Sequence, residues 1–188
     1  MPILGAVASS RLTAVPNSYE SIATTTVGSG GSSTIDFTSI PATYKHLQIR
    51  IIARTTATNN NSYSTIRFNN DTSTNYTSHQ IYGTGSGSPG AWGSGSLTFI
   101  YAAVGAAQSA AANIFGPGVV DILDYASTSK FKTLRGLSGS DSNGGGIAIP
   151  TSGLWRNSGT AISSIQITTD GTSFAQNSQF ALYGIKDS

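Results

Sequence analysis

Short runs in which hydrophobic and polar residues alternate follow one another along most of the chain. The clearest run covers 45–56, where Leu47, Ile49 and Ile51 fall on one face and polar residues such as Arg50 fall on the other. A period of two residues is typical of a β-strand with one buried and one solvent-facing side. We therefore expect 45–56 to be a strand whose hydrophobic face lies on the core.

Ten further runs are rich in Ile, Val, Thr, Phe and Tyr and are separated by Gly, Asn, Ser and Pro, a composition typical of strands and turns. The eleven expected strands are 20–27, 33–38, 45–56, 62–69, 77–83, 95–104, 112–125, 130–138, 145–149, 161–169 and 178–186. Their spacing is that of a sandwich or barrel. We expect an all-β fold, a jelly-roll-like antiparallel β-sandwich, with an extended N-terminal arm over 1–18 and one domain over 19–188.

The segments between these runs also carry information. Stretches of low sequence complexity predict loops at 28–33, 57–62 and 83–96. Short polar connections predict a hairpin at 125–130 and another at 169–172, where Asp-Gly suits a tight turn. The Ala-rich segment 101–113 is expected to be a loop or short turn, with a helix as the alternative. The run 178–186 is apolar on both faces, which predicts a strand inside a sheet or under a subunit contact.

Composition restricts the class of protein. Only 10% of residues are charged, whereas 29 Ser and 23 Thr make 52 of the 188 positions small hydroxyl residues and 38% are hydrophobic. This hydrophobic content argues against disorder. The formal net charge is +2, so we expect no nucleic-acid partner. The apolar stretch 2–8 is far shorter than the ~20 residues of a membrane span, and we expect neither a signal peptide nor a membrane association.

Residue types that usually carry chemistry are scarce. The chain has no Cys and only two histidines, His46 and His79, without metal-binding spacing, so we expect no metal site and no cofactor. The close acidic pair Asp121 and Asp124 is three positions apart on one expected strand, which turns the two carboxylates to opposite faces.

We expect one of these two acidic residues to form an ion pair across the hairpin with Lys130, Lys132 or Arg135. The glycines of 83–90 precede a strand rather than a helix, unlike a phosphate-binding loop. With no nucleophile motif either, the sequence predicts a protein that is not an enzyme and has no catalytic residues.

Two features predict contacts with a protein partner. Arg50 and Arg54 lie on one face of an expected strand in a window without acidic residues, and such a stripe suits an acidic surface. The apolar arm is too short to fold alone and suits docking on a neighbour. The expected partner-binding residues are Pro2, Ile3, Leu4, Val7, Arg11, Arg50 and Arg54. The alternative for the arm is packing on its own domain.

Three blocks of sequence resemble a family of small virion structural proteins of tailed bacteriophages, cyanophages among them. The blocks are SYESIATTTVGSGGSSTIDFTSIPATYKHLQIRIIART over 18–55, VVDILDYASTSKFKTLRGLSG over 119–139 and FALYGIKDS over 180–188. The resemblance implies a sandwich built into a virion that is assembled in the host cytoplasm. It does not decide where on the particle the protein sits.

Two placements follow from the resemblance. In the first, the chain is a capsid cement or decoration protein, a homotrimer that stabilises the head by binding major capsid protein or other virion proteins. In the second, it is a tail-fibre or baseplate module that binds host glycan through a loop. Trp92, placed among glycines, resembles an aromatic platform for stacking on a sugar and is the expected glycan contact of the second placement.

Overall fold

The computed structural model describes residues 18–142 and 145–186, and within these ranges the chain contains strands and loops but no helix. The expected arm, with Pro2, Ile3, Leu4, Val7 and Arg11, lies outside the described residues. The strands are β1 (Tyr19–Thr26), β2 (Thr34–Phe37), β3 (His46–Ala53), β4 (Asn61–Phe68), β5 (Tyr76–Tyr82), β6 (Gly90–Leu97), β7 (Ile100–Ala106), β8 (Gly116–Leu123), β9 (Lys132–Asp141), β10 (Gly146–Trp155), β11 (Ile165–Thr169) and β12 (Gln179–Ile185).

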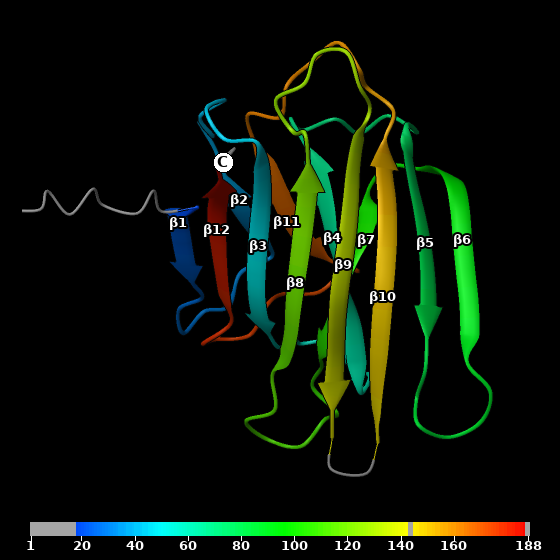
Figure 1. The fold of residues 1–188 in the computed structure, drawn as a ribbon. Helices are drawn as coiled ribbons and strands as arrows, with labels where there is room; N and C mark the ends of the chain where they lie inside the picture. The colour runs from blue at the N-terminus through cyan, green and yellow to red at the C-terminus, as the bar shows by residue number, and fades with distance from the viewer. Residues whose placement is uncertain (1–17, 143–144, 187–188) are drawn as a thin grey trace, which may run out of the picture.

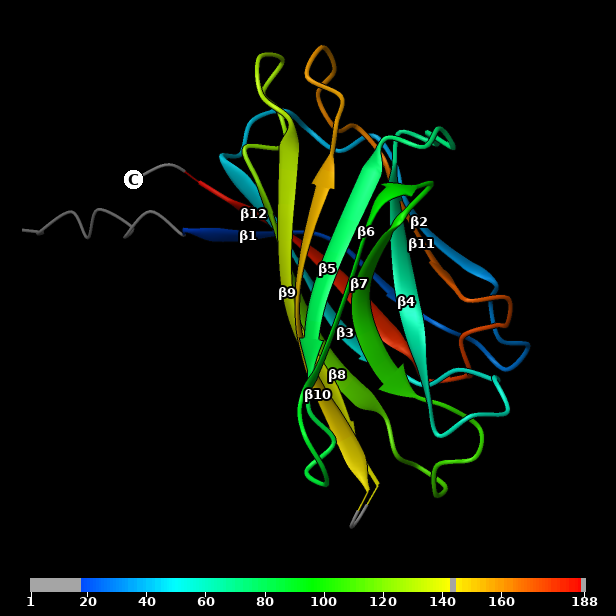
Figure 2. The same cartoon turned by 90° about the vertical axis from the view of Figure 1, so that its right-hand side faces the viewer.

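These strands form two sheets that pack face to face, which confirms the expected all-β sandwich (Figures 1 and 2). The eight-stranded sheet has the order β1-β12-β3-β8-β9-β10-β5-β6, and the four-stranded sheet has the order β2-β11-β4-β7. Every pairing between named strands is antiparallel. The jelly-roll connectivity expected for the sandwich stays a prediction.

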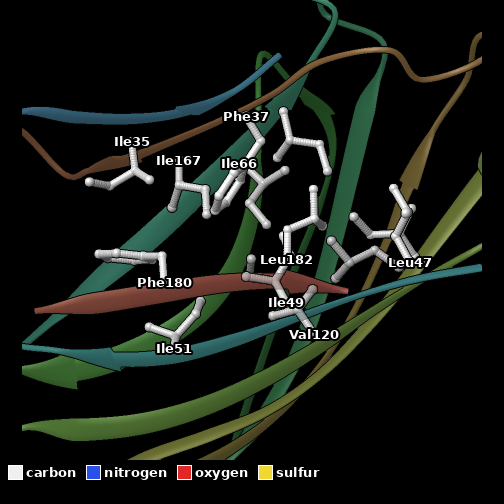
Figure 3. Packing of buried hydrophobic residues seen from close by; sticks show 14 of the residues in the cluster. Ile35, Phe37, Leu47, Ile49, Ile51, Ile66, Val120, Ile167, Phe180 and Leu182 are labelled. Carbon is white, nitrogen blue, oxygen red and sulfur yellow. The ribbon is translucent and has the colours of Figure 1, made fainter. Parts of the chain in front are cut away.

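The core lies between the two sheets and follows the alternation of the sequence (Figure 3). Leu47 and Ile49 of β3 are fully buried, and so are Ile66 of β4 and Ile167 of β11 on the opposite sheet. Burying one such side chain contributes about 1.5–3 kcal/mol to the free energy of folding. On the outer side of the large sheet, Arg50 and Ile52 of β3 are exposed, whereas Gln48 is buried.

Two further expectations about organisation are confirmed. The apolar last strand, β12, is paired on both sides, with β1 and β3. The segment 125–130 connects β8 to β9, which pair as an antiparallel hairpin. Both outcomes follow from signals that the sequence carries locally.

Four expectations about local structure are wrong. Residues 101–106 of the segment expected as a loop or short turn belong to strand β7, because their backbone pairs with β4. Residues 90–96, part of the expected loop 83–96, belong to strand β6, because its backbone pairs with β5 although its Gly-Ser-rich sequence has no hydrophobic face. The segment 169–172 does not close a hairpin, since β11 and β12 belong to different sheets. The expected strand 145–149 continues through Pro150 as β10. Pairing of β10 with β5 begins only at Thr151, so the missing donor of Pro150 falls outside that ladder.

Within residues 18–142 and 145–186, nothing helical has the length and hydropathy needed to cross a membrane.

Candidate functional site

The large sheet ends in the β5–β6 hairpin, which extends beyond β7, the edge strand of the small sheet (Figure 1). A cleft of about 470 Å³ lies where the inner face of this hairpin meets β4 and β7, and we call it the aromatic cleft. Its lining residues are Tyr63 of β4, Gln80 and Tyr82 of β5, Trp92 of β6, Tyr101 of β7, and Asp170, which follows β11. Six residues from five parts of the chain therefore meet at one edge of the sandwich.

Tyr101 is the centre of the aromatic packing in this cleft. Its ring lies 5.2 Å from Trp92 at 87°, 5.2 Å from Tyr63 at 68° and 5.0 Å from Phe99 at 90°, measured between ring centroids and planes. Such edge-to-face contacts contribute about 0.5–1.5 kcal/mol each. They fix the ring positions while Trp92 remains 42% exposed, which leaves aromatic surface for a ligand.

A β-bulge puts Tyr101 on the face that carries Tyr63. The register between β4 and β7 shifts between Ser64 and Thr65, so that Thr65 lies opposite Tyr101 whereas Ser64 lies opposite Ala103. Without the extra residue Tyr101 would lie opposite the next residue of β4 and point into the core. The bulge therefore adds Tyr101 to the cleft, while Ile100, Ala102 and Ala103 of β7 pack in the core.

The glycines of β6 make room for the side chains of β5. A Cβ atom at Gly90 would lie 2.2 Å from Cζ of Tyr82, so the Tyr82 ring lies directly over the glycine backbone. On the outer face, a Cβ atom at Gly93 would lie 2.3 Å from Cδ2 of His79. The Gly-rich sequence of β6, which predicts a loop, thus forms a flat backbone surface on which the Tyr82 ring packs.

Polar groups with unused hydrogen-bonding capacity lie beside these rings. Gln80 Nε2 and Thr151 Oγ1 are buried, and neither has a hydrogen-bond partner among the described residues. The two residues lie directly opposite each other on β5 and β10. An unpaired buried polar group costs about 1–3 kcal/mol. Since Gln80 lines the cleft, its Nε2 can offer a hydrogen-bond donor to a ligand.

Asp170 and Tyr63 supply the remaining polar chemistry of the cleft. Ser62 Oγ donates a hydrogen bond to Asp170 Oδ1, which fixes the carboxylate. Burial raises the pKa of Tyr63, and the charges of Tyr82, Tyr101 and Asp170 raise it further. The Tyr63 hydroxyl is therefore protonated at neutral pH and can both donate and accept a hydrogen bond.

The sequence pointed to one residue of this cleft, Trp92, and missed the others. Trp92 lies at the exposed rim, and its role as a glycan contact stays a prediction. The three tyrosines lie on strands far apart in sequence, and only the topology brings them together. A local signal exists for β6 alone, where a tryptophan stands among glycines.

The two arginines predicted to bind a partner have different surroundings. Arg50 is exposed, with its guanidinium 5.1 Å from the centroid of the Tyr183 ring and its Nε donating to Gln48 Oε1 at 3.2 Å. Arg54 lies in the loop after β3 and donates to four backbone carbonyls, those of Gln108, Ala110, Ala111 and Ile114. The Arg54 side chain therefore holds the loop 107–115, and its role towards a partner stays a prediction.

Both acidic residues form ion pairs, although the sequence predicts such a pair for only one of them. Arg135 Nε lies 3.0 Å from Asp121 Oδ2, and Lys130 Nζ lies 2.7 Å from Asp124 Oδ2. Lys132, the third expected partner, is instead fully buried, and its Nζ donates to the Asn157 carbonyl at 2.9 Å. Burial lowers the pKa of Lys132.

No group of three or more acidic or histidine side chains that could hold a metal ion occurs in the part of the chain that the structure describes. His46 Nδ1 accepts a hydrogen bond from the Asp124 backbone N–H at 3.0 Å. His79 lies over Gly93 on the outer face. The two histidines are therefore on different strands and serve local packing.

A second surface feature lies on the outer face of the large sheet. Val119, Leu137 and Pro150 are direct cross-strand neighbours on β8, β9 and β10, and Ile81 of β5 lies beside Pro150. We call these four residues the outer apolar row. Leu137 and Ile81 are each 59% exposed. Such a row is typical of a surface that meets another protein.

Comparison with known proteins adds no assignment to this geometry. No family model matches the chain, and neither the curated proteins nor the solved structures contain a significant match.

Proposed function

We propose that this chain is a non-enzymatic structural protein of a tailed-phage particle and that it binds saccharide in the aromatic cleft, as a tail-fibre or baseplate module would. The observation that carries the proposal is the combination of exposed aromatic surface at Trp92 with the unpaired amide of Gln80 in one cleft. The phage assignment rests on the sequence resemblance.

The chemistry of the cleft suits a sugar. One face of a pyranose ring presents C–H groups that pack on an aromatic ring, while its hydroxyls need donors and acceptors at the edges. Trp92 and Tyr101 supply the aromatic surface, and Gln80, Tyr63 and Asp170 supply the polar groups.

The same residues support binding rather than hydrolysis. Glycosidic hydrolysis usually requires two carboxyl groups about 5–9.5 Å apart. Asp170 is the one carboxylate among the described residues that line the cleft. The chain is therefore proposed to hold a saccharide without cleaving it.

Nuclear magnetic resonance of the full chain tests the proposal directly, because the protein has two tryptophans. The Trp155 indole N–H donates to Asp71 Oδ2 at 2.7 Å inside the core and serves as an internal reference. Titration with neutral trisaccharides of glucose, galactose, mannose and N-acetylglucosamine is expected to shift the Trp92 indole resonance and leave that of Trp155 in place.

A pair of variants provides the control. Trp92→Ala should reduce saccharide affinity at least tenfold. Phe131→Ala, which removes a ring that is 49% exposed and does not line the cleft, should leave the affinity unchanged. Equal shifts of both indole resonances, or no shift with any of the four sugars, would overturn saccharide binding.

Capsid decoration is the second candidate function, and the outer apolar row favours it. In that placement the large sheet docks on major capsid protein, with Arg50 beside the docking face. A count of copies per purified virion separates the two placements. Hundreds of copies would establish decoration of the head, whereas a few to a few dozen would place the protein in the tail.

A further inference from the structure

We infer that the aromatic cleft binds uncharged saccharides in preference to anionic ones and that Asp170 sets this preference. The inference rests on the proposed saccharide binding and adds the class of ligand and the residue that selects it.

The charges around the cleft favour an uncharged ligand. The described lining residues are four aromatic side chains, the Gln80 amide and the Asp170 carboxylate, with no lysine or arginine among them. Arg67 belongs to the same face of the small sheet, but its Nε donates to the Thr98 carbonyl at 3.1 Å and its guanidinium lies over Phe99. The formal charge of the cleft lining is therefore negative.

The Asp170 carboxylate has one oxygen available to a ligand, and its charge acts on the cleft. Its Oδ1 accepts the Ser62 hydroxyl, and no hydrogen bond among the described residues occupies Oδ2. The charge of Asp170 also contributes to the raised pKa of Tyr63, although burial is the main cause. The field of this carboxylate thus reaches a hydroxyl that lines the cleft.

The negative charge and the available Oδ2 atom of Asp170 affect neutral and anionic sugars in opposite ways. A sugar hydroxyl can donate to Oδ2 in a charge-assisted hydrogen bond. A sugar carboxylate, sulfate or phosphate at the same place is repelled. For two like charges about 5 Å apart in a partly exposed site, the repulsion weakens binding about tenfold. Added salt reduces this effect by screening.

Affinity measurements with matched sugars test the inference. The probes are cellotriose with cellotriouronate, and α-1,4-galactotriose with trigalacturonate, titrated into the full chain at low salt. In each pair the neutral sugar should bind about tenfold more tightly. Asp170→Asn keeps a carbonyl acceptor for Ser62 and removes the charge, so it should bring this ratio close to one.

Asp36→Asn is the control, because it removes the same charge from an exposed position on β2, outside the cleft. Asp36→Asn should leave the ratio of neutral-sugar to anionic-sugar affinity near ten. Equal binding of neutral and anionic sugars by the unaltered chain, or an unchanged ratio in Asp170→Asn, would overturn the inference and leave saccharide binding standing. If none of the four sugars binds and the neutral panel also fails, both the inference and the proposed function are wrong.

Discussion

Replacing Arg54 by Met should destabilise the protein, because this side chain holds a loop together. Its two terminal nitrogens donate to four carbonyls at 2.8–3.0 Å. The bonds to Ile114 and Ala110 are partly buried, and those to Ala111 and Gln108 are exposed, so water can replace the latter. At about 0.5–1.5 kcal/mol for each of the two partly buried bonds, the variant should lose about 2 kcal/mol of unfolding free energy.

Urea unfolding followed by circular dichroism measures this loss, and the melting temperature should fall by about 4–8 °C. Hydrogen exchange should accelerate in 107–115 first. Arg50→Met is the matched control, since Arg50 makes one side-chain hydrogen bond and lies on the exposed face, and its effect should stay within about 0.5 kcal/mol. A loss below about 1 kcal/mol for Arg54→Met would refute the reasoning that Arg54 organises this loop.

Three further outcomes are expected. Burial raises the pKa of Asp71, but its hydrogen bonds outweigh burial, so the pKa lies below the ordinary value of 3.8. The stabilisation by the charged carboxylate is therefore complete above about pH 5 and is lost as the pH falls below 4. Asp71→Asn should accordingly make the free energy of unfolding depend less on pH in the acid range. Gly116→Ala puts a Cβ atom 2.5 Å from a backbone oxygen and should cost about 3 kcal/mol in urea unfolding, whereas Gly28→Ala meets nothing within 4 Å and should be neutral. Removing the charge of Asp170 by substitution with Asn should lower the pKa of Tyr63, as read from the pH titration of its ring resonances.

The sandwich could be predicted from the sequence because one face of most strands is buried. The alternation in β3 places Ile49 and Ile51 in the core, and the apolar text of β12 places it inside the sheet. Strand β6 could not be predicted in this way. It is an edge strand stabilised by backbone pairing, and neither of its faces needs hydrophobic residues.

The candidate site was predictable only in part. Trp92 stood out because a large ring among glycines is unusual, but the bulge that turns Tyr101 towards Tyr63 depends on pairing between β4 and β7. The surroundings of Arg54 depend on a loop more than fifty residues further along the chain. Periodicity reports which face a residue takes, and it carries no information about contacts between distant segments.

Strand β6 provides part of the aromatic cleft but contributes little to the core. It pairs with β5 alone, and its side chains are exposed or half-buried. Except at Gly90 and Gly93, where a Cβ atom would meet the rings of Tyr82 and His79, substitutions there cost little of the free energy that keeps the two sheets together. The wall of the aromatic cleft can therefore change its chemistry one residue at a time while the core stays as it is. Under the proposed saccharide binding, such a strand would let the ligand change without a change of fold.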